Sequence, residues 1–85
     1  MFYVYVLRSK RDGNFYIGQT EDLKRRVSEH NAGQVPSTHK RIPVELSYYE
    51  ACNHHKDAIH REKYLKTTYG HRYLRNRLKH DLSAS

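Results

Sequence analysis

Alternating aromatic and aliphatic residues open the chain and predict a β-strand over residues 2–7. Residues 10–14 contain an Asp-Gly turn signal, so residues 14–18 should return as the second strand of a hairpin. Because successive side chains of a strand point to opposite faces, Tyr16 and Gly18 are expected on one face of this second strand.

A helical pattern follows the hairpin. Thr20 is expected to cap a helix that carries acidic residues in its first turn, extends to about residue 31 and ends before Gly33. Its stripe at i, i+4 and i+7 consists of Leu23, Val27 and His30. Arg26 lies beside this stripe, so Arg26 and His30 are expected on the side of the helix that meets the sheet.

The rest of the chain predicts one more strand and two more helices. The expected elements are a loop over 34–43, a strand over 44–50, a helix over 54–69 capped by Asn53 and closed by Gly70, and a helix over 71–82. We therefore expect an α/β (α+β) fold, in which a small three-stranded antiparallel sheet is flanked by three helices. It forms one domain over residues 1–82, followed by a flexible tail over residues 83–85.

The net charge of the chain indicates the class of partner that it binds. The 85 residues include 16 Lys and Arg against nine Asp and Glu, a net charge of +7. A small domain with this excess attracts polyanions, and nucleic acid is the commonest of them. No apolar run approaches the length of a membrane span and no secretory leader is apparent, so a cytoplasmic protein without a membrane partner is expected. The single cysteine, Cys52, excludes an internal disulfide.

Basic residues are concentrated toward the carboxyl end. Residues 63–79 contain six Lys and Arg, no acid and three Tyr. Basic and aromatic residues together are typical of a surface that holds phosphates and stacks on bases, although a solvated helix face with inward-packing tyrosines is the alternative. The residues expected to contact nucleic acid are Lys66 and Arg72 in this segment, and Ser37, Thr38, His39 and Lys40 in the loop. For His39, an exposed polar loop residue is the alternative.

Titratable side chains are also predicted on the core-facing sides of the helices. Glu62 shares the i, i+4, i+7 spacing of Ala58 and Leu65. Arg26 and His30 face the sheet from the first helix. Such groups are rarely buried unless they are paired. Two interpretations stay open, namely a structural ion pair between Arg26 and Glu62 and an active site that faces a groove.

The predicted hairpin resembles the paired motifs of the GIY-YIG nuclease family. The second motif is present literally as Tyr16-Ile17-Gly18. The first appears as the tripeptide of residues 3–5, in which Tyr3 replaces the glycine of the family motif. The resemblance covers about residues 2–80 and is greatest to small stand-alone bacterial (URI-type) members.

This resemblance implies a metal-dependent endonuclease that hydrolyses phosphodiester bonds in nucleic acid, with DNA favoured over RNA. The catalytic residues it implies are Tyr5, Tyr16, Arg26, His30 and Glu62, and Asn76, which corresponds to a downstream asparagine of the family, is expected to contact the substrate. Tyr5 and Tyr16 would activate water as hydrogen-bonded partners, with either as the base, and Arg26 would stabilise the transition state. Glu62 would hold Mg²⁺ or Mn²⁺.

Other functions stay open beside the nuclease. The first alternative is a non-catalytic nucleic-acid-binding module that uses the same basic face, and the second is a small interaction module whose charge confers solubility. A zinc site is disfavoured, because the seven histidines lack short ligand spacings.

Overall fold

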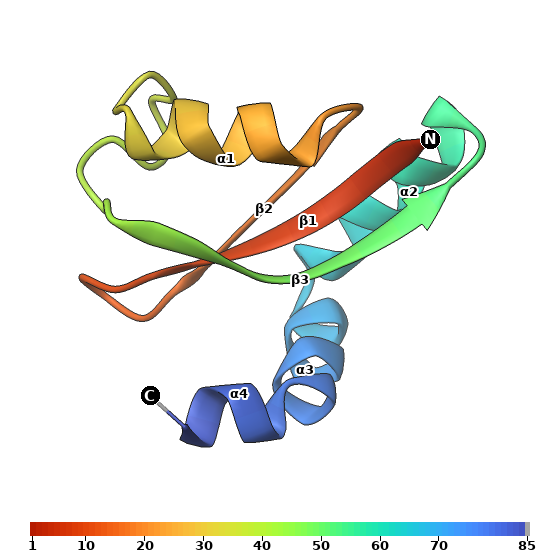
Figure 1. The fold of residues 1–85 in the computed structure, drawn as a ribbon. Coiled ribbons are helices and arrows are strands. Elements are labelled where there is room, and N and C mark those ends of the chain that lie inside the picture. Colours follow the sequence, from red (N-terminus) through yellow and green to blue (C-terminus); the bar gives the residue numbers. More distant parts are fainter. Residues whose placement is uncertain (85) are drawn as a thin grey trace.

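A three-stranded antiparallel sheet lies at the centre of the fold in the computed structural model, which describes residues 1–84 (Figure 1). β1 (Phe2–Ser9) is the middle strand, and β2 (Phe15–Thr20) and β3 (Val44–Cys52) pair with it on either side. The predicted fold class is confirmed. The strand order β2-β1-β3 leaves β2 at an edge of the sheet, which is where the candidate site forms.

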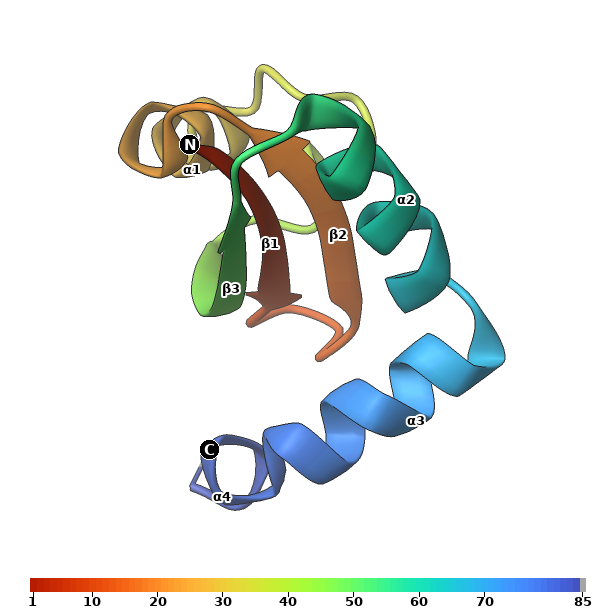
Figure 2. The same ribbon diagram turned by 90° about the vertical axis from the view of Figure 1, so that its right-hand side faces the viewer.

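Helices cover both faces of this sheet (Figure 2). α1 (Leu23–Asn31) lies over one face, and α2 (His55–Leu65) lies over the other. α3 (Thr68–Arg77) and α4 (Lys79–Ser83) continue from α2. The described residues thus contain four helices rather than the predicted three, because the last predicted helix is broken at Leu78.

The period-2 pattern of β1 accounts for two separate apolar clusters. Val4 and Val6 pack with side chains of α2 and α3, including Ala58, Leu65 and Leu74. The intervening Tyr5 and Leu7 pack on the other face with Val44 of β3 and with Leu23 and Val27 of α1. A strand that is apolar on both faces is expected where helices cover both sides of a sheet.

The start of α1 differs from the prediction. Asp22, not Thr20, caps the helix, and its Oδ1 accepts a hydrogen bond from the backbone N–H of Arg25 at 3.0 Å. Thr20 instead ends β2, and its hydroxyl oxygen accepts from the backbone N–H of Asp22 at 3.1 Å. Both residues are good cap formers, and the longer strand decides between them.

The junction of α2 and α3 also differs from the prediction. α2 follows His54 rather than an Asn53 cap, and it ends at Leu65 rather than at Gly70. Thr67 begins the next helix, where its hydroxyl oxygen accepts from the Gly70 backbone N–H at 3.1 Å. Gly70 is therefore buried inside α3, where a Cβ would overlap the Tyr64 carbonyl oxygen and the Leu65 backbone. It permits close helix contact instead of ending a helix.

The carboxyl-terminal segment includes Ser83, the first residue of the predicted tail, in a helix. α4 extends through Ser83, and Leu82 packs against the core cluster of Val4 and Val6. The final residue of the predicted tail, residue 85, lies outside the described residues. Within residues 1–84, the helices lack the length and apolar character needed to cross a membrane.

Candidate active site

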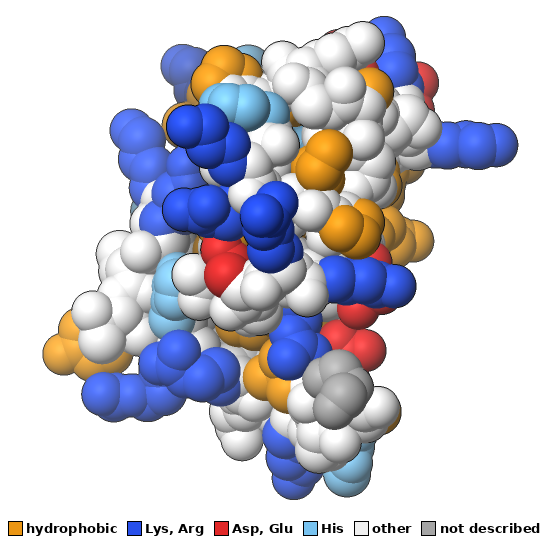
Figure 3. All heavy atoms as spheres, turned by 90° about the vertical axis from the view of Figure 1, so that its left-hand side faces the viewer, with side chains coloured by type: hydrophobic (Ala, Val, Ile, Leu, Met, Phe, Trp, Pro, Cys, Tyr) orange, Lys and Arg blue, Asp and Glu red, His pale blue; other side chains and the backbone are white. Residues whose placement is uncertain are grey.

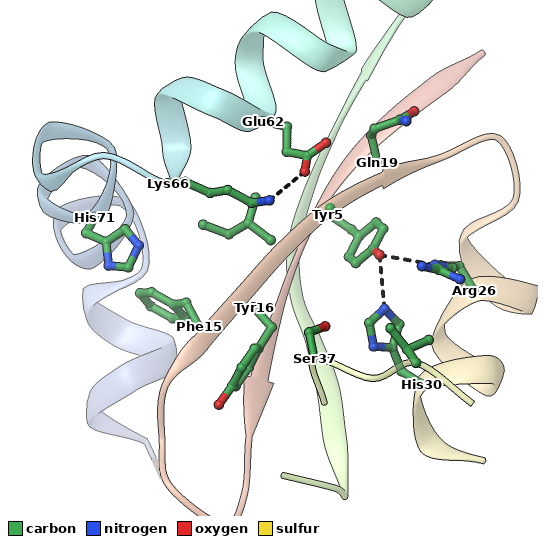
Figure 4. A pocket seen from close by; sticks show the side chains of 13 residues that line it. Tyr5, Phe15, Tyr16, Gln19, Arg26, His30, Ser37, Glu62, Lys66 and His71 are labelled. Atoms are coloured by element: carbon green, nitrogen blue, oxygen red, sulfur yellow. Dashed lines mark hydrogen bonds and ion pairs between the residues drawn. The ribbon is translucent and has the colours of Figure 1, made fainter. Parts of the chain in front are cut away.

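A pocket of about 490 Å³ opens at the β2 edge of the sheet (Figure 4). Its lining includes the side chains that the sequence predicted as catalytic, namely Tyr5, Tyr16, Arg26, His30 and Glu62. Ser37 and Lys66, two predicted substrate contacts, line it as well. We call this hollow the active-site pocket.

The edge position of β2 explains how residues from opposite faces of the sheet reach one pocket. Tyr16 and Gly18 belong to the face that α1 covers, whereas Phe15 and Ile17 belong to the face of α2. Figure 4 shows β2 running between two groups of side chains, with Glu62 from α2 on one side and the α1 residues on the other. If β2 were a central strand, the strands on both sides of it would separate the α1 residues from Glu62.

Gly18 allows a residue of the central strand to take part. Tyr5 of β1 lies directly opposite Gly18 in the β1–β2 register. A Cβ at Gly18 would overlap the hydroxyl and Cζ of Tyr5. The phenol therefore passes through the space that a side chain at position 18 would fill. Its hydroxyl reaches the edge pocket, although Tyr5 as a whole is only 3% exposed.

A chain of buried hydrogen bonds holds the Tyr5 hydroxyl. This hydroxyl lies 3.0 Å from His30 Nε2, and His30 Nδ1 lies 2.7 Å from the Thr38 hydroxyl. His30 is 3% exposed and Thr38 is 0% exposed. Because both ring nitrogens have fixed partners, the imidazole is held in one orientation. Thr38 was predicted as a substrate contact, and its burial corrects this to a contact with His30.

Arg26 bonds to the same phenol. Its Nε donates to the Tyr5 oxygen at 3.3 Å, and its Nη1 donates to Glu29 Oε1 at 3.1 Å. The hydrogen bond to Tyr5 raises the pKa of Arg26 and the bond to Glu29 adds to this rise, so the guanidinium stays charged. Burial lowers the pKa of His30, and the Arg26 charge lowers it further, which favours the neutral imidazole.

Tyr16 is not the hydrogen-bonding partner of Tyr5 that the sequence analysis expected. Its hydroxyl donates to Asp12 Oδ2 at 2.9 Å, near the hairpin turn, and Arg41 pairs with the same carboxylate oxygen at 3.0 Å. Burial raises the pKa of Tyr16, and the hydrogen bond to Asp12 raises it further. In Figure 4 the Tyr16 hydroxyl points away from Tyr5. The two phenols therefore have separate environments.

Glu62 also has a different partner from the one considered. The structural ion pair with Arg26, one of the two interpretations left open, is replaced by two local pairs, Arg26 with Glu29 and Glu62 with Lys66. Lys66 Nζ lies 2.7 Å from Glu62 Oε2, and the Glu62 side chain is 22% exposed at the pocket. A half-buried carboxylate at a pocket can bind a ligand, whereas a carboxylate in a fully buried ion pair cannot.

The donors at this site fit a hard divalent cation that takes most of its ligands from outside the protein. Residues 1–84 contain no cluster of three or more His, Cys, Asp or Glu side chains that would form a complete cage. Glu62 contributes one carboxylate, and Mg²⁺ commonly combines one or two carboxylates with waters and substrate phosphates. Glu62 is therefore the residue that would hold such an ion.

Other predicted contacts lie outside this pocket. Besides the buried Thr38, the predicted substrate contacts absent from its lining are His39, Lys40, Arg72 and Asn76. Arg72 lies over the ring of Tyr69, which is 68% exposed, whereas Tyr73 packs inward on the core. Figure 3 shows Lys and Arg side chains spread over the face that holds the end of α1, the following loop and the hairpin turn. The basic surface therefore extends beyond the pocket.

Several lining residues were not predicted. They are Phe15, Ile17, Gly18, Gln19, Val35 and His71. The β2 members of this set could have been predicted from the alternation of the strand, because residues on both faces of an edge strand can border one hollow. Glu29, the partner of Arg26, was recognisable from its i, i+3 spacing.

Comparison with known proteins adds a family relationship. A family model described as the GIY-YIG catalytic domain matches residues 1–78. A UPF0213 protein of Lacticaseibacillus paracasei is 43% identical over 72 residues, which are 84% of this chain and 80% of that protein. A UPF0213 protein of Halobacterium salinarum is 42% identical over 67 residues, 78% of this chain and 86% of that protein. No solved structure gives a significant match.

Proposed function

This chain belongs to the GIY-YIG nuclease family, and from that premise we propose that it is an endonuclease that uses Mg²⁺ or Mn²⁺ to hydrolyse phosphodiester bonds, in DNA more than in RNA. Membership itself implies a nuclease-type function. The observation that carries the finer proposal is the convergence of Tyr5, Arg26, His30 and Glu62 on the active-site pocket.

Tyr5 is the general base in this proposal. Arg26 Nε can only donate a hydrogen bond, so the Tyr5 oxygen is the acceptor. The Tyr5 proton is therefore available for a hydrogen bond to His30 Nε2. His30 Nδ1–H then donates to the Thr38 hydroxyl. When Tyr5 transfers its proton to neutral His30, the phenolate oxygen can take a proton from the attacking water. Tyr16, with its pKa raised, is less suited to this role.

Arg26 has two tasks in this scheme. Its Nε stabilises the developing phenolate, and the N–H groups not directed at Tyr5 or Glu29 are available to the phosphate. A forked guanidinium matches phosphate oxygens and stabilises the added negative charge of the transition state. Ser37 and Lys66 line the same pocket and are proposed to position the phosphate. His39, Lys40, Arg72 and Asn76 are proposed to hold more distant parts of the substrate.

Glu62 would hold the divalent cation. Such an ion, when bound, neutralises phosphate charge and stabilises the leaving oxygen. Lys66 Nζ already contacts Glu62 Oε2. To bind the cation, Glu62 must therefore release Lys66 or share its carboxylate between Lys66 and the cation. The freed Lys66 ammonium then remains beside the phosphate as a second positive charge.

A cleavage assay with labelled DNA and RNA in Mg²⁺ or Mn²⁺ tests this function. We expect Arg26→Ala to lower kcat by about 10²–10³-fold and Glu62→Gln to abolish cleavage. Arg25→Ala and Asp57→Asn are matched controls, because they remove the same charges on the same helices outside the pocket. Parent-like cleavage by Arg26→Ala and Glu62→Gln, in preparations free of contaminating nuclease, would refute the site.

A further inference from the structure

A second hollow adjoins the active-site pocket between the β1–β2 turn and α3. It measures about 370 Å³, and its lining includes Asn14, Phe15, Tyr16, His71 and Arg75. Three of these side chains, Phe15, Tyr16 and His71, also line the active-site pocket. We call this second hollow the hairpin pocket. The two pockets therefore form one groove with a shared wall.

The shared wall is aromatic. Phe15 and His71 meet edge to face, with ring centroids 6.2 Å apart, and both are half-buried. Figure 4 shows both rings beside Lys66 on the side of the pocket away from Arg26. Half-exposed rings at the border of a polar pocket offer surfaces on which nucleobases stack.

The charges at the two ends of this wall suit phosphates. Arg75 lines the hairpin pocket, is exposed, and has no ion pair or side-chain hydrogen bond within residues 1–84. Lys66 lines the active-site pocket beside the rings, where its Nζ pairs with Glu62 Oε2 at 2.7 Å. Among the described residues that line either pocket, Glu62 is the only acid. When Glu62 engages a divalent cation and releases Lys66, the groove offers a positive charge on each side of the aromatic wall, which parallels phosphate, base and phosphate along a strand.

We propose that the hairpin pocket binds an unpaired nucleotide next to the scissile phosphate, with its base against Phe15 and His71 and its outer phosphate at Arg75. A base inside a duplex is covered on both faces by its neighbours, so it cannot stack on a protein ring unless it leaves the helix. The preferred substrate is therefore single-stranded at this nucleotide. This inference rests on the proposed function, which places the scissile phosphate in the active-site pocket.

Binding without cleavage tests the subsite. The measurement is the anisotropy of a fluorescent 12-nucleotide single strand, and of the same sequence as a blunt duplex, in EDTA at low salt. We expect Arg75→Gln to weaken single-strand binding by about fivefold and to reduce the salt slope by about 0.7. We expect Phe15→Leu, which keeps an apolar side chain, to weaken it by about fivefold or more. Duplex binding should be weaker than single-strand binding.

Arg77→Gln is the matched control. Arg77 lies on the same helix and carries the same charge, but it lies over the Tyr48 ring and outside both pockets. Thermal melting verifies that each variant is folded, and Arg75→Gln remains informative if Phe15→Leu is not. Single-strand affinities of Arg75→Gln and Phe15→Leu equal to that of Arg77→Gln would overturn the subsite. Parent binding to duplex as tight as to single strand, or no binding to single strand, would overturn it too.

A parallel cleavage assay separates this inference from the proposed function. If the parent protein never cuts but Arg75→Gln selectively loses single-strand binding, the lost binding supports the subsite and the absent cleavage refutes the nuclease. Cleavage by the parent that is unaffected by Arg75→Gln, together with unchanged binding, refutes the subsite and leaves the nuclease intact.

Discussion

At the scale of single residues, the site depends on one missing side chain. Tyr5 belongs to the middle strand, and only the lack of a Cβ at Gly18 lets its hydroxyl pass to the sheet edge. The phenol then meets His30 and Arg26 there. A glycine within a strand often marks such a close approach.

Gly18→Ala should therefore disable the site while the fold persists. The added methyl would displace the Tyr5 hydroxyl from His30 and Arg26, and we expect kcat to fall about 10²-fold, as for other misplaced catalytic groups. Overpacking should also lower the free energy of unfolding by about 1–3 kcal/mol.

A double-mutant cycle with Tyr5→Phe tests the stated cause. Removing the hydroxyl relieves the closest overlap, so the added methyl should cost less stability in the Tyr5→Phe background than in the parent. Equal costs in both backgrounds, or parent-like cleavage by Gly18→Ala, would contradict the proposed contact.

His30 predicts a pH dependence of stability. Burial, the largest cause, and the Arg26 charge lower its pKa below the ordinary value of 6.5. The unfolded chain therefore binds this proton more tightly, and stability should fall as the pH drops through about 6.5 toward the folded-state pKa. Above pH 6.5 this group should have no effect. The groups facing it are Tyr5, Arg26, Thr38 and Glu29.

Denaturant unfolding of the parent and of His30→Gln between pH 8 and pH 5 measures this effect. The parent should lose stability over this range, and the variant should lose less. Asp12 and Glu50, whose pKa values are lowered from 3.8 and 4.5, contribute only at more acidic pH. Parallel pH profiles of the parent and the variant would show that His30 is not the titrating group.

At the scale of elements, the short joint between α2 and α3 brings Lys66 and His71 to the same pocket. Thr67 holds the joint from both sides, because its hydroxyl donates to the Tyr64 carbonyl at 2.6 Å and accepts from the Gly70 N–H at 3.1 Å. On the back of α2, Arg61 forms two hydrogen bonds to Glu50 at 2.8 and 2.9 Å. α2 is therefore anchored on both sides of Glu62.

Gly70→Ala tests the role of this joint. Its Cβ would overlap backbone atoms of Tyr64 and Leu65, which cannot rotate away. We expect a loss of about 1–3 kcal/mol in unfolding free energy and a fall in the melting temperature of about 4–8 °C per kcal/mol. His71→Ala, one residue along the same helix, lacks this clash and is the control. A melting temperature for Gly70→Ala at or above that of the parent would exclude the close contact.

The elements also show what a sequence can and cannot predict here. The hairpin, the sheet side of Arg26 and His30, and the core side of Glu62 follow from periods of 2 and 3.6, which are local. Gly70 was misassigned because a glycine after a helical pattern fits a helix end as well as a close helix contact. The Thr38–His30 bond depends on how the loop between α1 and β3 closes, which no local pattern encodes. The Asp12–Tyr16 bond was within reach, since a tight turn brings these residues together.

At the scale of the whole molecule, the net charge of +7 includes Lys and Arg side chains spread over the face seen in Figure 3. Lys66 and Arg75 lie along the groove and Arg26 lies at its catalytic end. We expect the logarithm of single-strand affinity to fall with the logarithm of salt concentration with a slope of about −2 or steeper, which corresponds to about three phosphates.

Anisotropy titrations in EDTA between 25 and 200 mM salt, taken as about one decade of ionic strength, measure this slope. Sodium glutamate in place of chloride checks for specific anion effects. A slope near zero would mean that the basic face does not contact phosphates, and would favour the small interaction module whose charge serves solubility.

The position of β2 between two helical layers has a further consequence. A nucleic-acid strand bound in the groove would contact groups carried by α1 on one side and by α2 and α3 on the other, and α1 and α2 lie over opposite faces of the sheet. A ligand that binds only the folded form stabilises it by RT ln(1 + [L]/Kd). An uncleavable oligonucleotide should thus stabilise both helical layers, and we expect it to slow backbone hydrogen exchange in α1 and in α2.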